Sequence, residues 1–171
     1  MTRRPRFPAR QGLMLAGLLI VSVLSAGCEP KDRRPGMWLS GAEVTMPIED
    51  WSFVNDAPEV QIETHPWYGI PFSVTTVIAA AGNRVFVPSI YDEPVDFPGT
   101  KYWNRVIAAD PAVRLRVDGK LYHMIAHPAA DDSEFAEGLA ALAAKYDFWR
   151  DVSEGGGQDI HFAIIRLEPV E

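Results

Sequence analysis

Short stretches of alternating apolar and polar residues run through the middle of this chain of 171 residues. In residues 59–64, EVQIET, the apolar Val60 and Ile62 alternate with polar neighbours, which predicts a half-buried strand. Residues 72–80 and 84–87 are rich in β-branched side chains, and the Ala-Gly-Asn stretch between them is typical of a hairpin turn. This part of the sequence therefore predicts three strands.

A second hairpin is predicted further along the chain. Residues 113–117 and 121–126 form it, and the Asp-Gly pair at 118–119 supplies the left-handed turn positions between them. Residues 160–167 predict a last strand, which follows a loop with three consecutive glycines. Because no helix begins directly after these glycines, we interpret them as a linker and not as a phosphate-binding loop.

A helical pattern occurs in two places. The stretch 99–119, GTKYWNRVIAADPAVRLRVDG, predicts a short helix that leads into a strand. Residues 133–149 predict a longer helix, started by a capping box of Asp131 and Glu134. Its apolar residues recur at spacings of three and four: Phe135, Leu139, Leu142, Tyr146 and Trp149. Short antiparallel strands with only two helices predict a mainly β (α+β) domain, a small antiparallel barrel with two packing helices.

The first 27 residues differ in composition from the rest. They contain four arginines, no acidic residue and an apolar run at 12–24, which is the pattern of a secretory signal peptide. The sequence LSAGC at 24–28 resembles the lipobox of bacterial lipoproteins, with Cys28 as the acylated residue. The alternative is an ordinary cleaved signal in which Cys28 is incidental.

The lipobox resemblance divides the chain into a signal peptide at 1–27, a tether at 28–36 and one domain at 37–171. Acyl chains on Cys28 would attach the exported protein to a membrane of the bacterial cell envelope without spanning it. Cys28 is the only cysteine, which excludes disulfides within the chain.

Net charge argues against nucleic acid as a partner. Removal of the signal takes away four basic residues and leaves 12 basic against 23 acidic residues, a net charge of −11. An acidic domain of this kind repels a phosphate backbone at long range.

The order of these elements between residues 59 and 128 resembles the pyridoxamine phosphate oxidase-like split β-barrel family, which is related to the deazaflavin-dependent nitroreductases. The resemblance rests on GIPFSVTTVIAAAGNRVFVPS at 69–89, on KYWNRVIAADPAVRLRVDGKLY at 101–122, and on the spacing between them. It implies a split barrel that binds FMN or a deazaflavin, often at a homodimer interface. It also implies a flavin-dependent oxidoreductase that acts on a small molecule.

The same resemblance implies a set of cofactor-binding residues. Two lie on the strand that lines the flavin ring, two lie at the end of the next strand, and Lys101 matches the phosphate-binding lysine. A lysine is charged at neutral pH and serves as a point charge for phosphate. The implied residues are Ser73, Thr75, Pro88, Ser89, Lys101 and Trp103.

Two of these residues also have a structural interpretation. Trp103 lies on a short helix next to a barrel, where an aromatic residue is commonly part of the core. Lys101 stands at the start of the same helix, where a solvated lysine needs no ligand. The sequence leaves both interpretations open beside cofactor binding.

Other basic residues are weaker candidates. Arg114 and Arg116 share one face of a strand, which is usually a face in contact with water, although phosphate is within the reach of such side chains. His123 and His127 also share a face, but a metal site needs a third ligand that the sequence does not place beside them. We predict no metal site and assign no catalytic residue.

Two functions from different classes follow. The first is a membrane-anchored lipoprotein whose split barrel binds a flavin and transfers a hydride to or from a small substrate. The second is a non-catalytic envelope lipoprotein that uses the barrel to bind a ligand or a protein. The second is favoured by the acidic residues Asp92, Glu93 and Asp96 near the implied phosphate site, and by the absence of an arginine early in the second strand, where many members of the family carry one.

Overall fold

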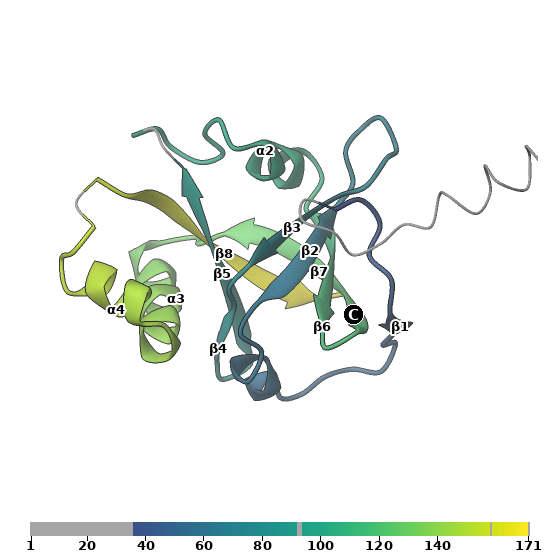
Figure 1. Ribbon diagram of the computed structural model, residues 1–171, viewed down its shortest axis with the longest axis horizontal. Coiled ribbons are helices and arrows are strands. Elements are labelled where there is room, and N and C mark those ends of the chain that lie inside the picture. The colour runs from purple at the N-terminus through teal and green to yellow at the C-terminus, as the bar shows by residue number, and fades with distance from the viewer. Residues whose placement is uncertain (1–35, 92–93, 158, 171) are drawn as a thin grey trace, which may run out of the picture. The chain divides into compact units, whose positions relative to one another are not determined.

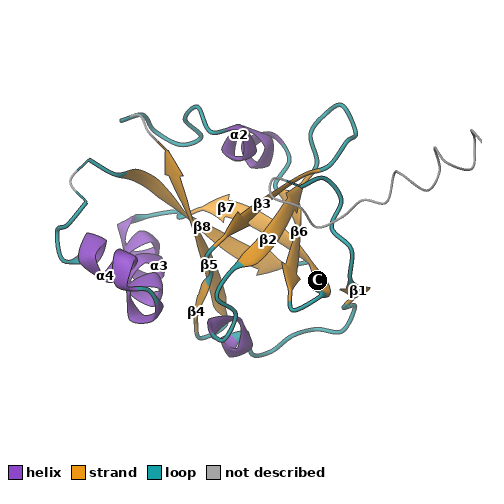
Figure 2. Cartoon of the chain, in the orientation of Figure 1, coloured by secondary structure: helices purple, strands orange, loops and turns teal. Residues whose placement is uncertain are grey.

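The computed structural model describes residues 36–91, 94–157 and 159–170, which form an antiparallel sheet curled into a half-barrel with helices packed against it (Figures 1 and 2). The predicted signal peptide, Cys28 and most of the predicted tether lie outside the described residues. Within the described ranges no helix is long and apolar enough to cross a membrane.

The sheet has one connected path of antiparallel strands in the order β3-β2-β6-β7-β8-β5-β4, and β1 pairs with β7 in parallel. The first four strands are β1 (Ala42–Glu43), β2 (Val60–Thr64), β3 (Phe72–Thr76) and β4 (Ala79–Ala81). The others are β5 (Arg84–Tyr91), β6 (Ala112–Val117), β7 (Lys120–Pro128) and β8 (His161–Pro169). The helices are the 3₁₀ helix η1 (Ser52–Asn55), α2 (Tyr102–Ala109), α3 (Asp132–Lys145) and α4 (Asp147–Ser153).

The predicted single strand at 72–80 is wrong, because the chain divides there into β3 and β4. These two strands are consecutive in sequence but lie at opposite ends of the sheet path. Val77 and Ile78 form the corner between them, and the buried Ile78 uses its backbone N–H to bind the hydroxyl of Tyr146 (3.3 Å). The corner joins the two ends of the sheet and gives it the curled shape.

The predicted single helix at 133–149 is also wrong, because α3 ends at Lys145 and Tyr146 has an extended backbone (φ −124°, ψ 127°). The Lys145 ammonium donates to three backbone carbonyls, those of Val54, Ala57 and Ile78 (2.9, 2.5 and 2.8 Å). Burial lowers the pKa of Lys145, an effect that Asp56 partly opposes. These bonds tie the end of α3 to the η1 region and to the corner between β3 and β4. Because the chain breaks here and α4 begins at Asp147, three α-helices and not two pack around the sheet.

Local signals at the turns and caps are confirmed. Asp118 and Gly119 both have positive φ (47° and 76°) between β6 and β7, as the hairpin prediction requires. The Asp131 side chain accepts from the Glu134 backbone N–H at 2.9 Å and so caps α3. The Glu134 carboxylate returns to the N–H of Ala130 (2.7 Å), one residue earlier than in the usual capping box.

Strand alternation divides the core into two parts. On β5, Val85 and Val87 point into the barrel, and Phe86 points out to the layer of α3 and α4. The helices come close to the sheet at Gly138, because a Cβ there would lie 2.5 Å from Ile164 and 2.8 Å from Phe86. Figure 2 shows α3 and α4 on this outer side of β5 and β8, with α2 across another side of the barrel.

Candidate functional site

A groove opens where β5 continues beyond the end of β4. Only Arg84, Val85 and Phe86 of β5 pair with β4, and the rest of β5 pairs with β8 alone. Pro88 lies in this second part, and its carbonyl accepts from the Thr76 hydroxyl (3.3 Å) on the side away from β8. The backbone nitrogen and carbonyl of a strand residue point to the same side of the strand. The nitrogen of Pro88 therefore also points away from β8, and its missing N–H costs no hydrogen bond between β5 and β8.

Two adjoining cavities make up this groove, which we call the β3–β5 groove. The first has a volume of about 470 Å³ and the second about 370 Å³. Thr76, Val77, Pro88 and Lys101 line both, so the two cavities are continuous. The first is also lined by Glu59, Val74, Thr75 and Trp103, and the second by Ile90, Tyr146, Phe148 and Trp149.

Lys101 stands at the N-cap position of α2, at the edge of the groove. Its backbone is extended (φ −65°, ψ 125°), and its side chain forms no capping bond. The ammonium donates instead to the Ile90 carbonyl of β5 at 2.6 Å. This bond holds a positive charge beside both cavities.

Trp103 belongs to the barrel core and also borders the first cavity. Its side chain is 2% exposed and packs within the interior cluster that includes Ile107 of the same helix. The two interpretations of Trp103 therefore do not exclude one another. The ring supports the barrel, and one part of it forms groove wall.

The two predicted serines do not line the groove. Ser89 follows Pro88 on β5 and so points to the opposite side of the strand, where its hydroxyl donates to the buried Asn104 of α2 (2.7 Å). Ser73 is also buried, and its backbone exchanges two hydrogen bonds with Gly36 (3.0 and 3.2 Å). Of the predicted cofactor residues, the structure brings together Thr75, Pro88, Lys101 and Trp103.

Sequence reasoning missed the aromatic wall of the second cavity. Tyr146, Phe148 and Trp149 come from the α3–α4 break and from α4, a region that the sequence pattern predicts as one continuous helix. The sequence carried no local signal of the break, because the apolar spacing of three and four continues through Tyr146 and Trp149. In the structure Phe148 is exposed, while Trp149 is buried.

The other basic candidates lie outside the groove. Arg114 pairs with Glu63 (2.9 Å) and Glu43 (2.8 Å) on the outer side of the barrel. His123 lies 3.1 Å from Glu43, and His127 lies 3.7 Å from Glu168. The part of the chain that the structure describes contains no group of three or more His, Cys, Asp or Glu residues placed to hold a metal ion.

The acidic loop that follows β5 lies partly outside the described residues, at 92–93. Asp96 does not line the β3–β5 groove; it lines a separate hollow with Tyr91 and His161. Burial raises the pKa of Tyr91, and the Asp96 carboxylate adds to this effect. The described acidic residue that borders the groove is Glu59, which is further back in the sequence.

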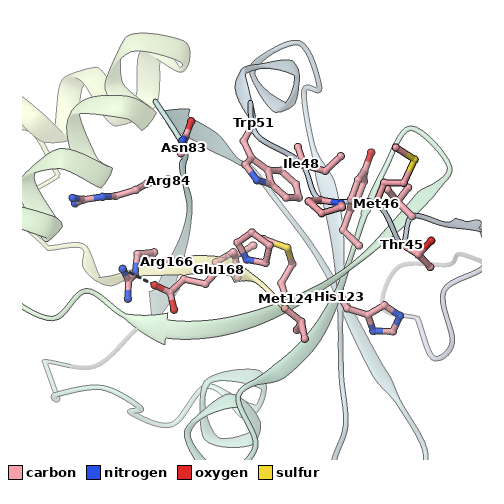
Figure 3. A pocket seen from close by; sticks show the side chains of 16 residues that line it. Thr45, Met46, Ile48, Trp51, Asn83, Arg84, His123, Met124, Arg166 and Glu168 are labelled. Atoms are coloured by element: carbon pink, nitrogen blue, oxygen red, sulfur yellow. Dashed lines mark ion pairs between the residues drawn. The ribbon is translucent and has the colours of Figure 1, made fainter.

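The protein has a second and larger cavity. It has a volume of about 1040 Å³ and lies between residues 44–51, the β4–β5 turn and the adjoining ends of β7 and β8 (Figure 3). We call it the N-terminal pocket. None of its lining residues also lines the β3–β5 groove.

Solved structures with the same architecture identify the fold. The chain is similar to a conserved hypothetical protein from Mycobacterium tuberculosis (TM-score 0.52, 10% identity), covering 75% of this chain and 87% of that one. It is similar to HutZ, the heme storage protein from Vibrio cholerae (TM-score 0.50, 16% identity), over 70% of this chain and 86% of that one. The chain has the split-barrel fold.

A more distant structural neighbour is a protein of the pyridoxinephosphate oxidase family from Clostridium acetobutylicum. Its TM-score is 0.45 at 10% identity, over 68% of this chain and 78% of that one. No protein-family model matches the sequence, and no curated protein matches it. The likeness to the first two structures establishes the split barrel, and at these identities it establishes no function.

Proposed function

We propose that the protein binds a flavin, FMN or a deazaflavin, in the β3–β5 groove and acts as an oxidoreductase on a small molecule. The observation that carries this proposal is the convergence of Thr75, Pro88, Lys101 and Trp103 on one groove. Three separate segments of the chain supply these residues. The volume of the first cavity, about 470 Å³, lies within the range of roughly 300–1000 Å³ that is common for small-molecule sites.

The groove residues fit the chemistry of a flavin phosphate and ring. The Lys101 ammonium is the positive group at the groove edge that would hold the phosphate, and Thr75 lines the same cavity. The aromatic wall of Phe148 and Trp149 offers an apolar surface for a ring system. The residues therefore match both ends of an elongated anionic aromatic ligand.

A bound flavin supplies the hydride or electron transfer itself. The task of the chain is to bind the phosphate at Lys101 and to orient the ring against the groove wall. No residue in the groove is assigned as an acid or base. A homodimer in which a second copy covers the open groove agrees with this arrangement.

The second candidate is a non-catalytic lipoprotein that binds a ligand or a protein with the same barrel. The observation that favours it is Glu59, which lines the same cavity as Lys101, because an acidic residue there opposes a phosphate. The withdrawal of Ser73 and Ser89 into buried positions removes two hydroxyls from the phosphate site.

A flavin titration distinguishes these functions, and a Lys101→Ala variant locates the binding site. We expect the purified protein to bind FMN or a deazaflavin saturably at micromolar concentration, as measured by quenching of flavin fluorescence. The variant should bind roughly 10- to 100-fold more weakly, because it loses a charge-assisted bond to the phosphate. Lys120→Ala is the matched control, since it removes the same charge from the exposed first residue of β7 and should leave the affinity unchanged.

Two results would contradict the flavin proposal in different ways. A lack of saturable binding by either cofactor removes the oxidoreductase function and leaves the ligand-binding alternative. Unchanged affinity in Lys101→Ala, with a normal unfolding temperature, removes Lys101 from the binding site. Retention of the fold is checked by thermal unfolding of both variants.

We further propose that Cys28 carries the lipid that attaches the protein to the cell envelope. A Cys28→Ser variant is then expected to lose fatty-acid incorporation in labelled cells, because the acylated sulfur is absent. It should also move from the membrane fraction to the soluble fraction, unless an uncleaved signal holds it. Label incorporated equally by the variant and by the unchanged protein would show that Cys28 is not the lipidated residue.

A further inference from the structure

The N-terminal pocket has walls that come from the barrel core. Trp51, Tyr122, Met124 and Leu167 line it and are each at most 6% exposed. Trp51 and Tyr122 meet edge to face, with ring centroids 5.2 Å apart. On the outer side the pocket is bordered by Met46, which is 77% exposed. The buried side chains form an apolar floor, and the unbranched Met46 side chain at the rim can adapt to the shape of a ligand. Such a pocket is suited to an apolar ligand.

Two polar atoms on the residues that line this pocket have no hydrogen-bond partner among the residues that the structure describes. Arg166 Nε lies 3.1 Å from the Glu134 carboxylate, whereas the indole N–H of Trp51 is buried on a side chain that is 1% exposed and has no such ion pair. Buried tryptophans usually find an acceptor for this donor, because an unmade hydrogen bond is unfavourable. In Figure 3 the nitrogen-bearing edge of the Trp51 ring is turned toward the side of the pocket where Asn83 and Arg84 lie.

The charged residues around the pocket are already balanced by opposite charges. Arg84 pairs with Glu137 (2.5 Å), and Arg166 pairs with Glu168 (2.8 Å). Arg166 also contacts Glu134 (3.1 Å), and His123 lies 3.1 Å from Glu43. A charged ligand would have to compete with these pairs, so the pocket favours an uncharged one.

We propose that the N-terminal pocket is a second binding site, for a neutral and largely apolar molecule with a carbonyl oxygen that accepts a hydrogen bond from Trp51. The apolar walls bury the body of the ligand, and the carbonyl satisfies the indole N–H. The site is separate from the β3–β5 groove and does not depend on flavin binding there.

A pair of matched probes tests this site. 1-Indanone has a carbonyl, and indane has the same two rings without it. In proton–nitrogen correlation spectra of the purified protein, the five tryptophans give five indole signals. We expect 1-indanone to shift the Trp51 signal saturably downfield, and indane to bind without that shift.

Variants locate the effect. Trp51→Phe removes the donor and keeps a ring, so it should bind 1-indanone roughly two- to tenfold more weakly while indane binding stays almost unchanged. Trp67→Phe is the matched control, because Trp67 is 96% exposed and does not line the pocket. It should remove a different indole signal and leave the affinity for both probes as before.

Because Trp51 is a core residue, the exposed Met46→Ser variant gives a second test that leaves the core intact. The variant should bind both 1-indanone and indane more weakly, since it removes apolar surface from the pocket rim. The proposal is overturned if 1-indanone shifts no indole signal or that of another tryptophan. It is also overturned if Met46→Ser leaves both probes unaffected, or if FMN displaces 1-indanone, which would place the probe in the β3–β5 groove.

Discussion

Replacement of Arg114 by leucine is expected to lower the free energy of unfolding by about 3–5 kcal/mol, as measured by urea unfolding. The Glu63 carboxylate is 1% exposed, and the Arg114 guanidinium lies 2.9 Å from it. Without the guanidinium, the carboxylate keeps the Leu39 backbone N–H (2.5 Å) and His65 (3.3 Å) as partners. A buried charge that loses its counter-charge is strongly destabilising, which sets the size of the effect.

The matched control for this variant is Arg84→Leu. Arg84 pairs with Glu137, but both side chains are substantially exposed, so the loss should stay below about 1 kcal/mol. Equal losses in the two variants would mean that burial of Glu63 does not govern the strength of its ion pair.

The Arg114 variant should also loosen the segment that precedes β1. Glu63 accepts from the backbone of Leu39, and Arg114 pairs with Glu43 in β1 (2.8 Å). Both contacts hold the N-terminal segment against the outer side of the barrel. Hydrogen exchange at the Leu39 amide should therefore become faster in Arg114→Leu and stay unchanged in Arg84→Leu.

Replacement of Trp103 by alanine is expected to cost about 3–5 kcal/mol of folding stability, because the ring is buried in the barrel core and its removal leaves a cavity. Trp67→Ala is the control, because this exposed tryptophan should contribute less than about 0.5 kcal/mol. Chemical unfolding of both variants measures the difference. A loss below 1 kcal/mol in Trp103→Ala would contradict the core role of the ring.

The result for Trp103 affects how binding data are interpreted. Loss of flavin binding in Trp103→Ala would not by itself show that the ring contacts flavin. The same ring packs in the core and lines the groove, so its removal also destabilises the fold. Lys101→Ala is the cleaner test of the site, because the lysine side chain lies at the groove edge and not in the core. Flavin affinity of the Trp103 variant should be measured well below its unfolding temperature.

Part of the candidate site could be predicted from sequence. Thr75, Pro88 and Lys101 were placed at one site by the resemblance to split-barrel flavoproteins, and the structure brings them to one groove. Ser89 does not share that groove with Pro88, because its hydroxyl lies on the other side of β5 and donates to the buried Asn104. Glu59 was not foreseen, because its place on the groove depends on segments far apart in the sequence that line the same cavity.

The sequence by itself determined the features that depend on neighbouring residues. Strand alternation placed Val60 and Ile62 in the core, the Asp-Gly pair defined the β6–β7 turn, and Asp131 capped α3. Strand alternation repeats every second residue, the turn needs two adjacent residues, and the cap joins residues three apart. A short stretch of sequence is therefore sufficient to predict each of these features.

Only the tertiary structure decided the features that depend on distant segments. The division of 72–80 into two strands follows from pairing at opposite ends of the sheet. The end of α3 is fixed by bonds from Lys145 to carbonyls of η1 and of the corner between β3 and β4. The unpartnered N–H of Trp51 likewise emerges only when strands far apart in sequence surround it. Such contacts join residues that are far apart in the sequence and follow no repeating pattern. The groove and the pocket can therefore be found only in the folded structure.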